Sequence, residues 1–332
     1  MLRRICVLLV IILTIFIVSG CTEEQVDLEP ISQTRFMLDT VCSITVFGVR
    51  DSVLIDDAFE LLAEYEALFS VSIEGSDIWR INHAGGASVA VAPQTLKLIR
   101  LGVEFGVLSD GLFDITVGRL SSLWDFKGLA VVPSLVDLEM ARGTVDFRQI
   151  FDERGSVRLG NPDAWLDLGG IAKGFIADRL GEFLVGRGAV GAVVDLGGDV
   201  VVVGEKPDGS PWRLGVRHPF GERGDLLGVV ETGVASVVSS GVYERQFVEN
   251  GVIYHHILDP FTGFPSRSGV VSATVVAESA VIGDIISTIA ILVGSENVGE
   301  LLGQVNGFIG ALLVLEDGEL VQFGDISFML LG

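Results

Sequence analysis

The sequence predicts an α+β protein, and three observations support this class. Apolar residues make up 49% of the 332 residues and charged residues only 20%, which is typical of a globular protein with a sizeable core. Segments with strand-like alternation occur in runs and do not alternate strictly with helical segments. No repeat of fixed period and no long linker interrupts the chain, so we expect no clear cut between two domains in its folded part.

Helices are expected where apolar residues recur every three or four positions, and strands where apolar and polar residues alternate. The expected helices are 56–69, 76–82 (a short helix or turn), 93–109, part of 130–150, the segment from Gly169-Gly170 to 186, 280–293 and 296–303. The expected strands are 36–49, the start of 156–188, both halves of 191–209, 211–219, 227–238, 243–258, 270–277, 312–316 and 320–323. Residues 109–120 are expected to form a loop rich in Gly and Asp.

The N-terminus has the pattern of a secretory signal peptide. Two arginines precede the apolar run 5–18, and the small residues Val18-Ser19-Gly20 precede Cys21. The cysteine resembles that of a bacterial lipobox, which implies cleavage before Cys21 and acylation of that residue. We therefore expect a signal peptide at 1–20, a polar tether at 21–34 and a folded domain at 35–332. A plain transmembrane anchor is the alternative, although the apolar run is short for a bilayer span.

The chain is strongly acidic, with a formal net charge of -22. Removing residues 1–20 removes two arginines and no acids, which gives −22 − 2 = −24. Such a charge argues against nucleic acid as a partner. A protein this acidic that binds a polyanionic ligand is expected to recruit a metal cation as a bridge. Cys42 is the one cysteine left after Cys6 and Cys21, so no intramolecular disulfide is possible and a core position is expected.

The segment "LDLGGIAKGFIAD", residues 166–178, is the first candidate for chemistry. Paired glycines before a helix let the backbone approach a ligand closely, and helix N-termini attract phosphate. Lys173 adds a positive charge there. Asp178 is placed to cap, to form a salt bridge or to bind. A tight turn with a surface lysine is the competing interpretation, and the glycine spacing matches neither GxGxxG nor a P-loop.

The segment "YHHILDPFTGFP", residues 254–265, holds two of the four histidines of the chain. A histidine pKa near neutrality suits a general base. Neighbouring residues on a strand face opposite sides, so at most one of His255 and His256 faces a given site. A structural histidine is the alternative for each.

The segment "GDIIST", residues 283–288, places a carboxylate in an otherwise apolar helix. Asp284 and Thr288 are four residues apart and share one helix face. Their oxygens suit Mg²⁺ or Ca²⁺ better than zinc. The spacing alone favours an aspartate that caps a helix or pairs locally, with Thr288 bonded to the backbone of its own helix. In the loop 109–120, Asp114 and Thr116 could line a polar ligand, whereas Trp124 is expected in the core.

Taken together, the motifs resemble the ApbE family of FAD:protein FMN transferases. The resemblance extends over nearly all of the chain after the signal peptide, and it depends on the order of the motifs because each is weak alone. The motifs are "SDIWRIN", "DGLFDITVGRLSSLW", "LDLGGIAKGFIAD", "VDLGGDV", "SSGVYER", "HHILDPFTGFP" and "GDIIST".

The resemblance implies a fold and an activity. The fold would be ApbE-like and T-fold-like, with largely antiparallel sheets flanked by helices and an FAD cleft between two lobes. The reaction would be Mg²⁺-dependent cleavage of the FAD pyrophosphate, with FMN transferred to a Thr or Ser hydroxyl of an acceptor protein and AMP released. Implied acceptors are redox-pump subunits of the Rnf and Nqr type. A lipid anchor on the extracytoplasmic face fits the many family members that are lipoproteins.

The resemblance also assigns roles to residues. The metal ligands would be Asp284, Thr288 and the carbonyl of Gly170, with His256 and Asp284 as the catalytic residues and His255 facing away. The expected FAD contacts are Leu38, Ser72, Leu112, Phe113, Asp114, Asp167, Lys173, His256 and Leu258.

Two positions depart from the family pattern. Leu38-Asp39-Thr40 stands where Met-Gly-Thr is usual, and Ser72 stands where several relatives carry an aromatic residue that stacks on the flavin. Without that ring the balance between transfer and hydrolysis could shift. Two alternatives therefore remain: an FAD pyrophosphatase that yields FMN and AMP, and a lipoprotein that binds FAD without chemistry.

Overall fold

The computed structural model describes residues 29–49, 51–126, 128 and 130–331. The expected signal peptide, Cys21 and most of the expected tether lie outside these residues. Among the described helices, none combines the length and apolar character needed to cross a bilayer. Strand β1 already begins at Ile31, so the last four residues of the expected tether belong to a sheet.

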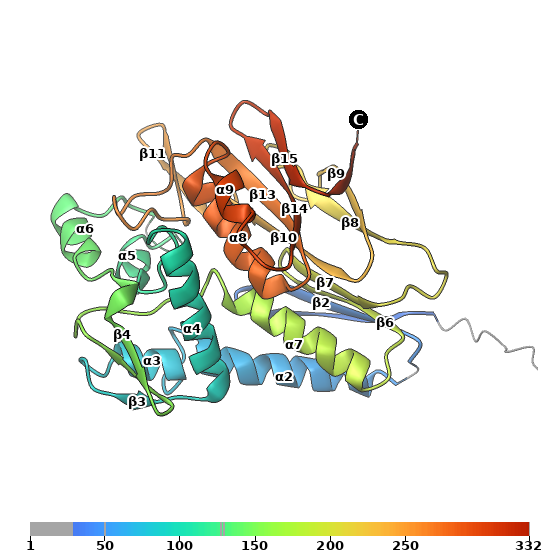
Figure 1. The fold of residues 1–332 in the computed structure, drawn as a ribbon, viewed down its shortest axis with the longest axis horizontal. Coiled ribbons are helices and arrows are strands. Elements are labelled where there is room, and N and C mark those ends of the chain that lie inside the picture. Colours follow the sequence, from blue (N-terminus) through green and yellow to red (C-terminus); the bar gives the residue numbers. More distant parts are fainter. Residues whose placement is uncertain (1–28, 50, 127, 129, 332) are drawn as a thin grey trace, which may run out of the picture.

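One eight-stranded sheet organises the fold, and all its neighbouring strands are antiparallel. This arrangement confirms the predicted α+β class with largely antiparallel sheets (Figure 1). The strand order is β1-β2-β6-β7-β10-β13-β14-β15. The strands are β1 (Ile31–Met37), β2 (Thr40–Phe47), β6 (Gly191–Leu196), β7 (Asp199–Gly204), β10 (Ala235–Gly241), β13 (Val270–Ala277), β14 (Phe308–Leu315) and β15 (Leu320–Gly324).

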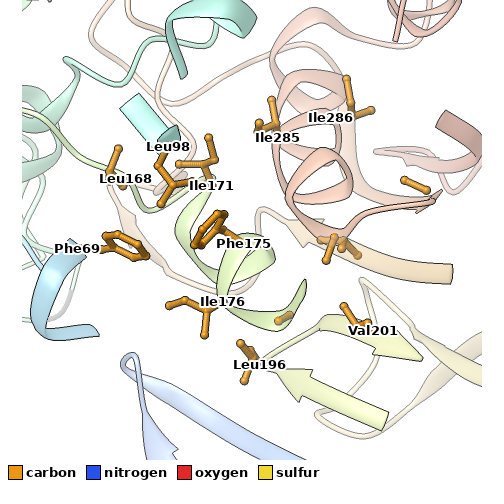
Figure 2. Packing of buried hydrophobic residues seen from close by; sticks show 14 of the residues in the cluster. Phe69, Leu98, Leu168, Ile171, Phe175, Ile176, Leu196, Val201, Ile285 and Ile286 are labelled. Atoms are coloured by element: carbon orange, nitrogen blue, oxygen red, sulfur yellow. The ribbon is translucent and has the colours of Figure 1, made fainter. Parts of the chain in front are cut away.

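Three helices cover one face of this sheet, namely α2 (Val53–Phe69), α7 (Ala172–Gly186) and α8 (Ala280–Val293) (Figure 1). Their apolar residues meet the sheet in the largest core cluster (Figure 2). Phe69 packs edge-on against Phe175 with ring centroids 5.8 Å apart, which fixes the end of α2 beside the start of α7. Ile285, Ile286 and Ile289 are fully buried and anchor α8.

A second, three-stranded sheet covers part of the opposite face. It consists of β8 (Trp212–Arg217), β9 (Leu226–Thr232) and β16 (Ser327–Leu330). A separate apolar cluster, which includes Val230 and Val276, joins the two sheets. Because β13 is covered on both faces, every residue of that strand is buried.

A smaller lobe lies beside the ends of α7 and α8 (Figure 1). Trp124 is fully buried there, as predicted, and its indole N–H donates to the Gly263 carbonyl at 2.9 Å. This bond ties the lobe to the turn that follows His255 and His256. The lobe contains α3 (Asp77–Asn82), α4 (Pro93–Leu108), α5 (Gly118–Leu123), α6 (Leu135–Arg142), the 3-10 turn Phe147–Gln149, β3 (Val89–Ala90), β4 (Ile150–Glu153) and β5 (Ser156–Leu159).

Several expected strands are wrong in the same way, because each is really two strands. Residues 36–49 contain the hairpin turn Leu38-Asp39, whose φ values are 53° and 60°. Residues 243–258 form the hairpin of β11 (Gln246–Glu249) and β12 (Val252–His255) around Asn250-Gly251. Both turns need positive φ, and Asn-Gly is a known signal for such a turn. The expected strand 227–238 likewise divides between β9 and β10.

The other expected elements agree with the structure to within a few residues. The helix expected at 296–303 is α9 (Val298–Leu302), and the closing hairpin is the pair β14 and β15. Cys42 is fully buried on β2, and burial raises the pKa of its thiol to about 11. It is therefore a neutral core residue, as predicted.

Candidate functional site

The N-terminal ends of α7 and α8 cross so closely that each helix caps the other. A Cβ at Gly174 would lie 2.4 Å from the Ala280 carbonyl oxygen, so only glycine allows this approach. The Gly174 amide donates to Asp284 Oδ2 at 3.0 Å. In return, the Ala280 amide donates to Asp178 Oδ1 at 2.7 Å. Of the roles considered for Asp178, the structure shows the capping one.

Asp284 faces a second carboxylate that the sequence analysis did not select. Asp199 starts β7 just after the Gly197-Gly198 turn and is only 1% exposed, while Asp284 is 3% exposed. Burial raises the pKa of Asp199 to about 8, and the neighbouring Asp284 charge adds to this rise. In the segment "VDLGGDV", the aspartate that follows the paired glycines is the sequence signal that could have revealed this residue.

Lys173 provides the only positive side chain recorded in contact with this pair within the described residues. Its Nζ donates to Asp199 Oδ2 at 2.6 Å. Burial alone would lower the pKa of Lys173, but Asp199 and Asp284 outweigh that effect and raise it. Two carboxylates and one ammonium leave one formal negative charge in a largely buried place. A proton or a cation must balance this charge.

The three predicted metal ligands lie together. Thr288 follows Asp284 by about one turn of α8. A Cβ at Gly170 would lie 3.6 Å from Thr288 Oγ1 and 3.3 Å from Phe113 Cε2. The hydroxyl, the glycine backbone and the Phe113 ring are therefore neighbours. Oxygen donors next to an unbalanced carboxylate fit Mg²⁺ chemistry, so the residues present are compatible with the predicted ion.

This donor set is unlike a dense cage of acids. In the described part of the chain, no group of three or more His, Cys, Asp and Glu residues could hold a metal ion. The predicted set contains one carboxylate, one hydroxyl and one carbonyl, and one carboxylate oxygen already accepts the Gly174 amide. An ion held here would need further oxygen ligands, such as water or phosphate.

His256 directly follows β12, whose last residue is His255, and the two histidines have different roles. The His256 backbone amide donates to the Arg245 carbonyl at 3.1 Å, while its Nδ1 is buried without a hydrogen-bond partner. Burial, and then the charges of Arg245 and His255, lower the pKa of His256 to about 3. Its imidazole is thus neutral near pH 7. His255 Nε2 is bonded to the Ser266 carbonyl at 3.0 Å, which is a structural contact of the kind expected.

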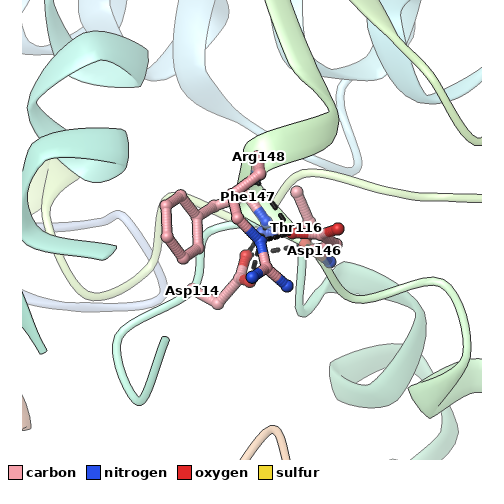
Figure 3. Close-up of polar contacts among 5 residues, drawn as sticks. All are labelled: Asp114, Thr116, Asp146, Phe147 and Arg148. Carbon is pink, nitrogen blue, oxygen red and sulfur yellow. Dashed lines mark hydrogen bonds and ion pairs between the residues drawn. The ribbon is translucent and has the colours of Figure 1, made fainter. Parts of the chain in front are cut away.

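Asp114, one of the expected FAD contacts, accepts hydrogen bonds from the chain on both carboxylate oxygens (Figure 3). Oδ1 accepts from the Thr116 amide at 2.7 Å and the Thr116 hydroxyl at 2.6 Å. Oδ2 accepts from the Phe147 amide at 2.9 Å. Burial raises its pKa, and these hydrogen bonds oppose the rise. Its side chain therefore fastens the loop 109–120 to the segment at Phe147, next to the partly exposed Leu112.

Two other expected FAD contacts flank the end of α2. The Leu38 amide in the β1–β2 turn donates to Glu66 Oε1 at 3.0 Å. Ser72 is exposed in the loop after α2, where its hydroxyl is 3.1 Å from that of Ser70. The contact of Phe69 with Phe175 brings this end of α2 next to the start of α7. The ribbon shows the same neighbourhood (Figure 1).

Asp167 and Leu258, two further expected FAD contacts, lie in turn segments of the chain. Asp167 Oδ1 accepts from the Gly169 amide at 2.8 Å and so shapes the turn before α7. Leu258 is only 7% exposed and belongs to the cluster around Trp124. Asp259 Oδ1 accepts from the Phe261 amide at 2.8 Å and so shapes the turn after Leu258. A shallow pocket between α4 and residues 304–306 is lined by none of the predicted site residues.

Comparison with known proteins agrees with this geometry. A model of the ApbE family matches residues 38–313. A Treponema pallidum protein named FAD:protein FMN transferase is 32% identical over 86% of this chain and 84% of its own. A Vibrio cholerae protein of the same name is 29% identical over 96% of this chain and 97% of its own.

Solved structures show the same relationship. The ApbE protein of Thermotoga maritima superposes with a TM-score of 0.81 and 33% identity, covering 89% of this chain and 97% of that one. The flavin transferase ApbE of Vibrio cholerae gives a TM-score of 0.78 at 27% identity, covering 89% and 96%. The family model, the transferase relatives and the shared fold agree with one another, and the chain belongs to the ApbE family.

Proposed function

We propose that the protein is a Mg²⁺-dependent FAD:protein FMN transferase that cleaves the FAD pyrophosphate and joins FMN to a Thr or Ser hydroxyl of an acceptor protein. The observation that carries this proposal is the junction of α7 and α8. There Asp284, Thr288 and Gly170 meet beside the largely buried pair Asp199 and Lys173. The names of the relatives supply the substrate, since they are FAD:protein FMN transferases.

Asp284, Thr288 and the Gly170 carbonyl would hold the ion. When bound, Mg²⁺ would neutralise pyrophosphate charge and stabilise the leaving AMP. Asp284 stays in place because the Gly174 amide holds one of its oxygens, and the buried isoleucines hold the helix that carries it. Lys173 and the positive end of the α7 helix dipole would attract the phosphates.

His256 is proposed to receive the proton of the attacking hydroxyl. A bond forms between that hydroxyl oxygen and the flavin-side phosphorus, the bridging P–O bond breaks, and AMP departs with the bridging oxygen. The hydroxyl proton passes to His256 Nδ1, which is neutral and has no hydrogen-bond partner. A cationic histidine could not accept it, and the imidazole of His256 is neutral at neutral pH.

An FAD pyrophosphatase is the second candidate, because water can attack the same phosphorus. The observation that favours it is exposed Ser72 at the position where several relatives stack an aromatic ring on the flavin. A flavin held without that ring would leave more room for water. The third candidate, a binder without chemistry, gives no reason for a buried carboxylate pair next to a phosphate-binding helix end.

One experiment separates the three. The full chain in detergent is incubated with FAD, Mg²⁺ and an acceptor peptide with the pattern Asp-Gly-x-Thr/Ser-Gly-Ala-Thr. Covalent FMN on the peptide supports transfer, whereas free FMN with AMP supports hydrolysis. Bound but intact FAD would overturn both enzyme proposals.

We further propose that the acceptors are subunits of Rnf-type and Nqr-type redox pumps, and that acylated Cys21 anchors the enzyme to the extracytoplasmic face of a membrane. Both parts follow from the family resemblance and the signal-like N-terminus. Metabolic labelling with a fatty acid tests the anchor, because Cys21→Ala should lose the label and leave the membrane fraction.

A further inference from the structure

Arg245 is the closest cross-strand neighbour of His256. The hairpin β11–β12 pairs Gln246 with His255, so the next position outward places Arg245 opposite His256. The hydrogen bond from the His256 amide to the Arg245 carbonyl at 3.1 Å continues this register. Side chains paired in this way start about 5 Å apart at Cβ. Arg245 therefore stands beside the proposed proton acceptor.

The guanidinium of Arg245 has no recorded partner among the described residues, and the side chain is exposed. The adjacent acid, Glu244, is engaged elsewhere, because Arg217 Nη1 donates to its Oε1 at 2.8 Å. The chain has 44 acidic residues against 22 basic ones, so an arginine can readily find a carboxylate. An arginine left free beside the candidate site is therefore available for an external anion.

Arg245 lies within electrostatic range of His256 and of Lys173, which also faces the buried carboxylates Asp199 and Asp284. Burial is the main cause of the low pKa of His256, and the charge of Arg245 lowers it further. The same charge acts to lower the pKa of Lys173. Lys173 is already matched by Asp199 at 2.6 Å. Among the described residues, Arg245 is thus an exposed cation next to His256 that has no ion-pair partner, so its guanidinium can bind an external anion.

We propose that Arg245 is a phosphate-binding residue that contacts the flavin-side phosphoryl group of the bound nucleotide. The planar guanidinium can donate two hydrogen bonds to one phosphoryl group, which a lysine cannot do. The neighbouring His256 would then face the same phosphorus from the side of the attacking hydroxyl. This inference rests on the proposed function, because it assumes that a flavin nucleotide binds at the α7–α8 junction.

The test compares ligands that differ only in phosphate. Binding of riboflavin, FMN and FAD to the full chain in detergent is measured by flavin fluorescence in EDTA, without turnover. R245Q should weaken FMN and FAD binding about tenfold or more, because the charged hydrogen bonds to the phosphoryl group are lost, and should leave riboflavin binding within twofold. R245K should recover part of the loss. R223Q is the matched control, because Arg223 is an exposed loop arginine with no recorded partner, and it should change none of the three affinities.

Each outcome decides the proposal. Equal weakening of riboflavin and FMN would mean that the substitution damages the site as a whole, and it would overturn a phosphate role. Unchanged FMN binding would overturn it as well. If the unmodified chain binds no flavin, the proposed function fails. If it binds all three and R245Q changes nothing, only the role of Arg245 fails.

Discussion

Two buried aspartates in this chain accept backbone hydrogen bonds, yet their surroundings are opposite. In the closed carboxylate site, Asp114 receives donors from Thr116 and Phe147 on both oxygens. In the open carboxylate site, Asp284 receives one backbone amide and faces the carboxyl group of Asp199, which Lys173 partly compensates. The comparison indicates that burial alone does not distinguish a functional carboxylate from a structural one. A functional carboxylate is distinguished by a neighbouring charge that the protein leaves unmatched.

The largest expected effect is on turnover at the open carboxylate site. Asp284→Asn keeps an oxygen for the Gly174 amide but removes the charge that would hold Mg²⁺. Turnover should fall about a hundredfold or more, with little change in the thermal midpoint. Product formation measured against Mg²⁺ concentration checks this. Activity that survives with the same Mg²⁺ dependence would show that Asp284 is not the ligand.

The closed carboxylate site should show the reverse behaviour. Asp114→Ala leaves the Phe147 amide and the Thr116 hydroxyl without acceptors, so the free energy of unfolding should fall by about 2–4 kcal/mol. Urea denaturation measures the loss. At a temperature where the variant remains folded, the Mg²⁺ concentration for half-maximal turnover should not change. A large shift in that concentration would mean that Asp114 belongs to the metal site.

The open carboxylate site also adjoins His256, which gives the molecule a pH dependence that Asp114 cannot explain. The pKa of His256 is about 3 in the folded chain and near 6.5 when unfolded, so the unfolded chain binds more protons below pH 6.5. The stability contributed by the neutral imidazole is present above 6.5 and is lost as the pH falls toward 3. The groups that set this pKa, besides burial, are Arg245, His255 and Lys173.

His256→Gln should remove that dependence. Between pH 7 and pH 5, protonation of His256 should lower the free energy of unfolding of the unmodified chain by about 2 kcal/mol. The drop measured for the variant should be smaller by the same amount. Urea midpoints at the two pH values provide the measurement. His255, whose burial lowers its pKa to about 4, contributes a similar slope in both proteins and serves as the internal reference. Equal slopes in the two proteins would mean that His256 is not held neutral.

The sequence predicted the fold class and most helices, because helix periodicity is a local property. It failed where two-residue turns divide a run of alternating residues, as at Leu38-Asp39 and Asn250-Gly251. The motif order led to Asp284, Thr288 and Gly170, which the structure brings together. Asp199 and Arg245 were missed, because their importance comes from partners 85 and 11 residues away, Asp284 and His256, whose proximity only the folded sheet and hairpin reveal.

The smallest expected effect would sharpen the comparison most, because it changes the charge of the open carboxylate site without touching a predicted ligand. Asp199→Asn removes one of the two facing carboxylates. The positive charge of Lys173 then acts against the charge of Asp284 alone. The Mg²⁺ concentration for half-maximal turnover should rise about tenfold, since the field that attracts the cation is weaker. The free energy of unfolding should change little, because relief of the like-charge contact with Asp284 offsets the loss of the ion pair with Lys173. Asp195→Asn is the control, since Asp195 starts the same turn but accepts only the Gly198 amide at 2.9 Å, and it should leave the Mg²⁺ dependence within twofold. If Asp199→Asn destabilises the chain and leaves that dependence unchanged, Asp199 would be a structural partner of Lys173, and the open carboxylate site would resemble the closed one.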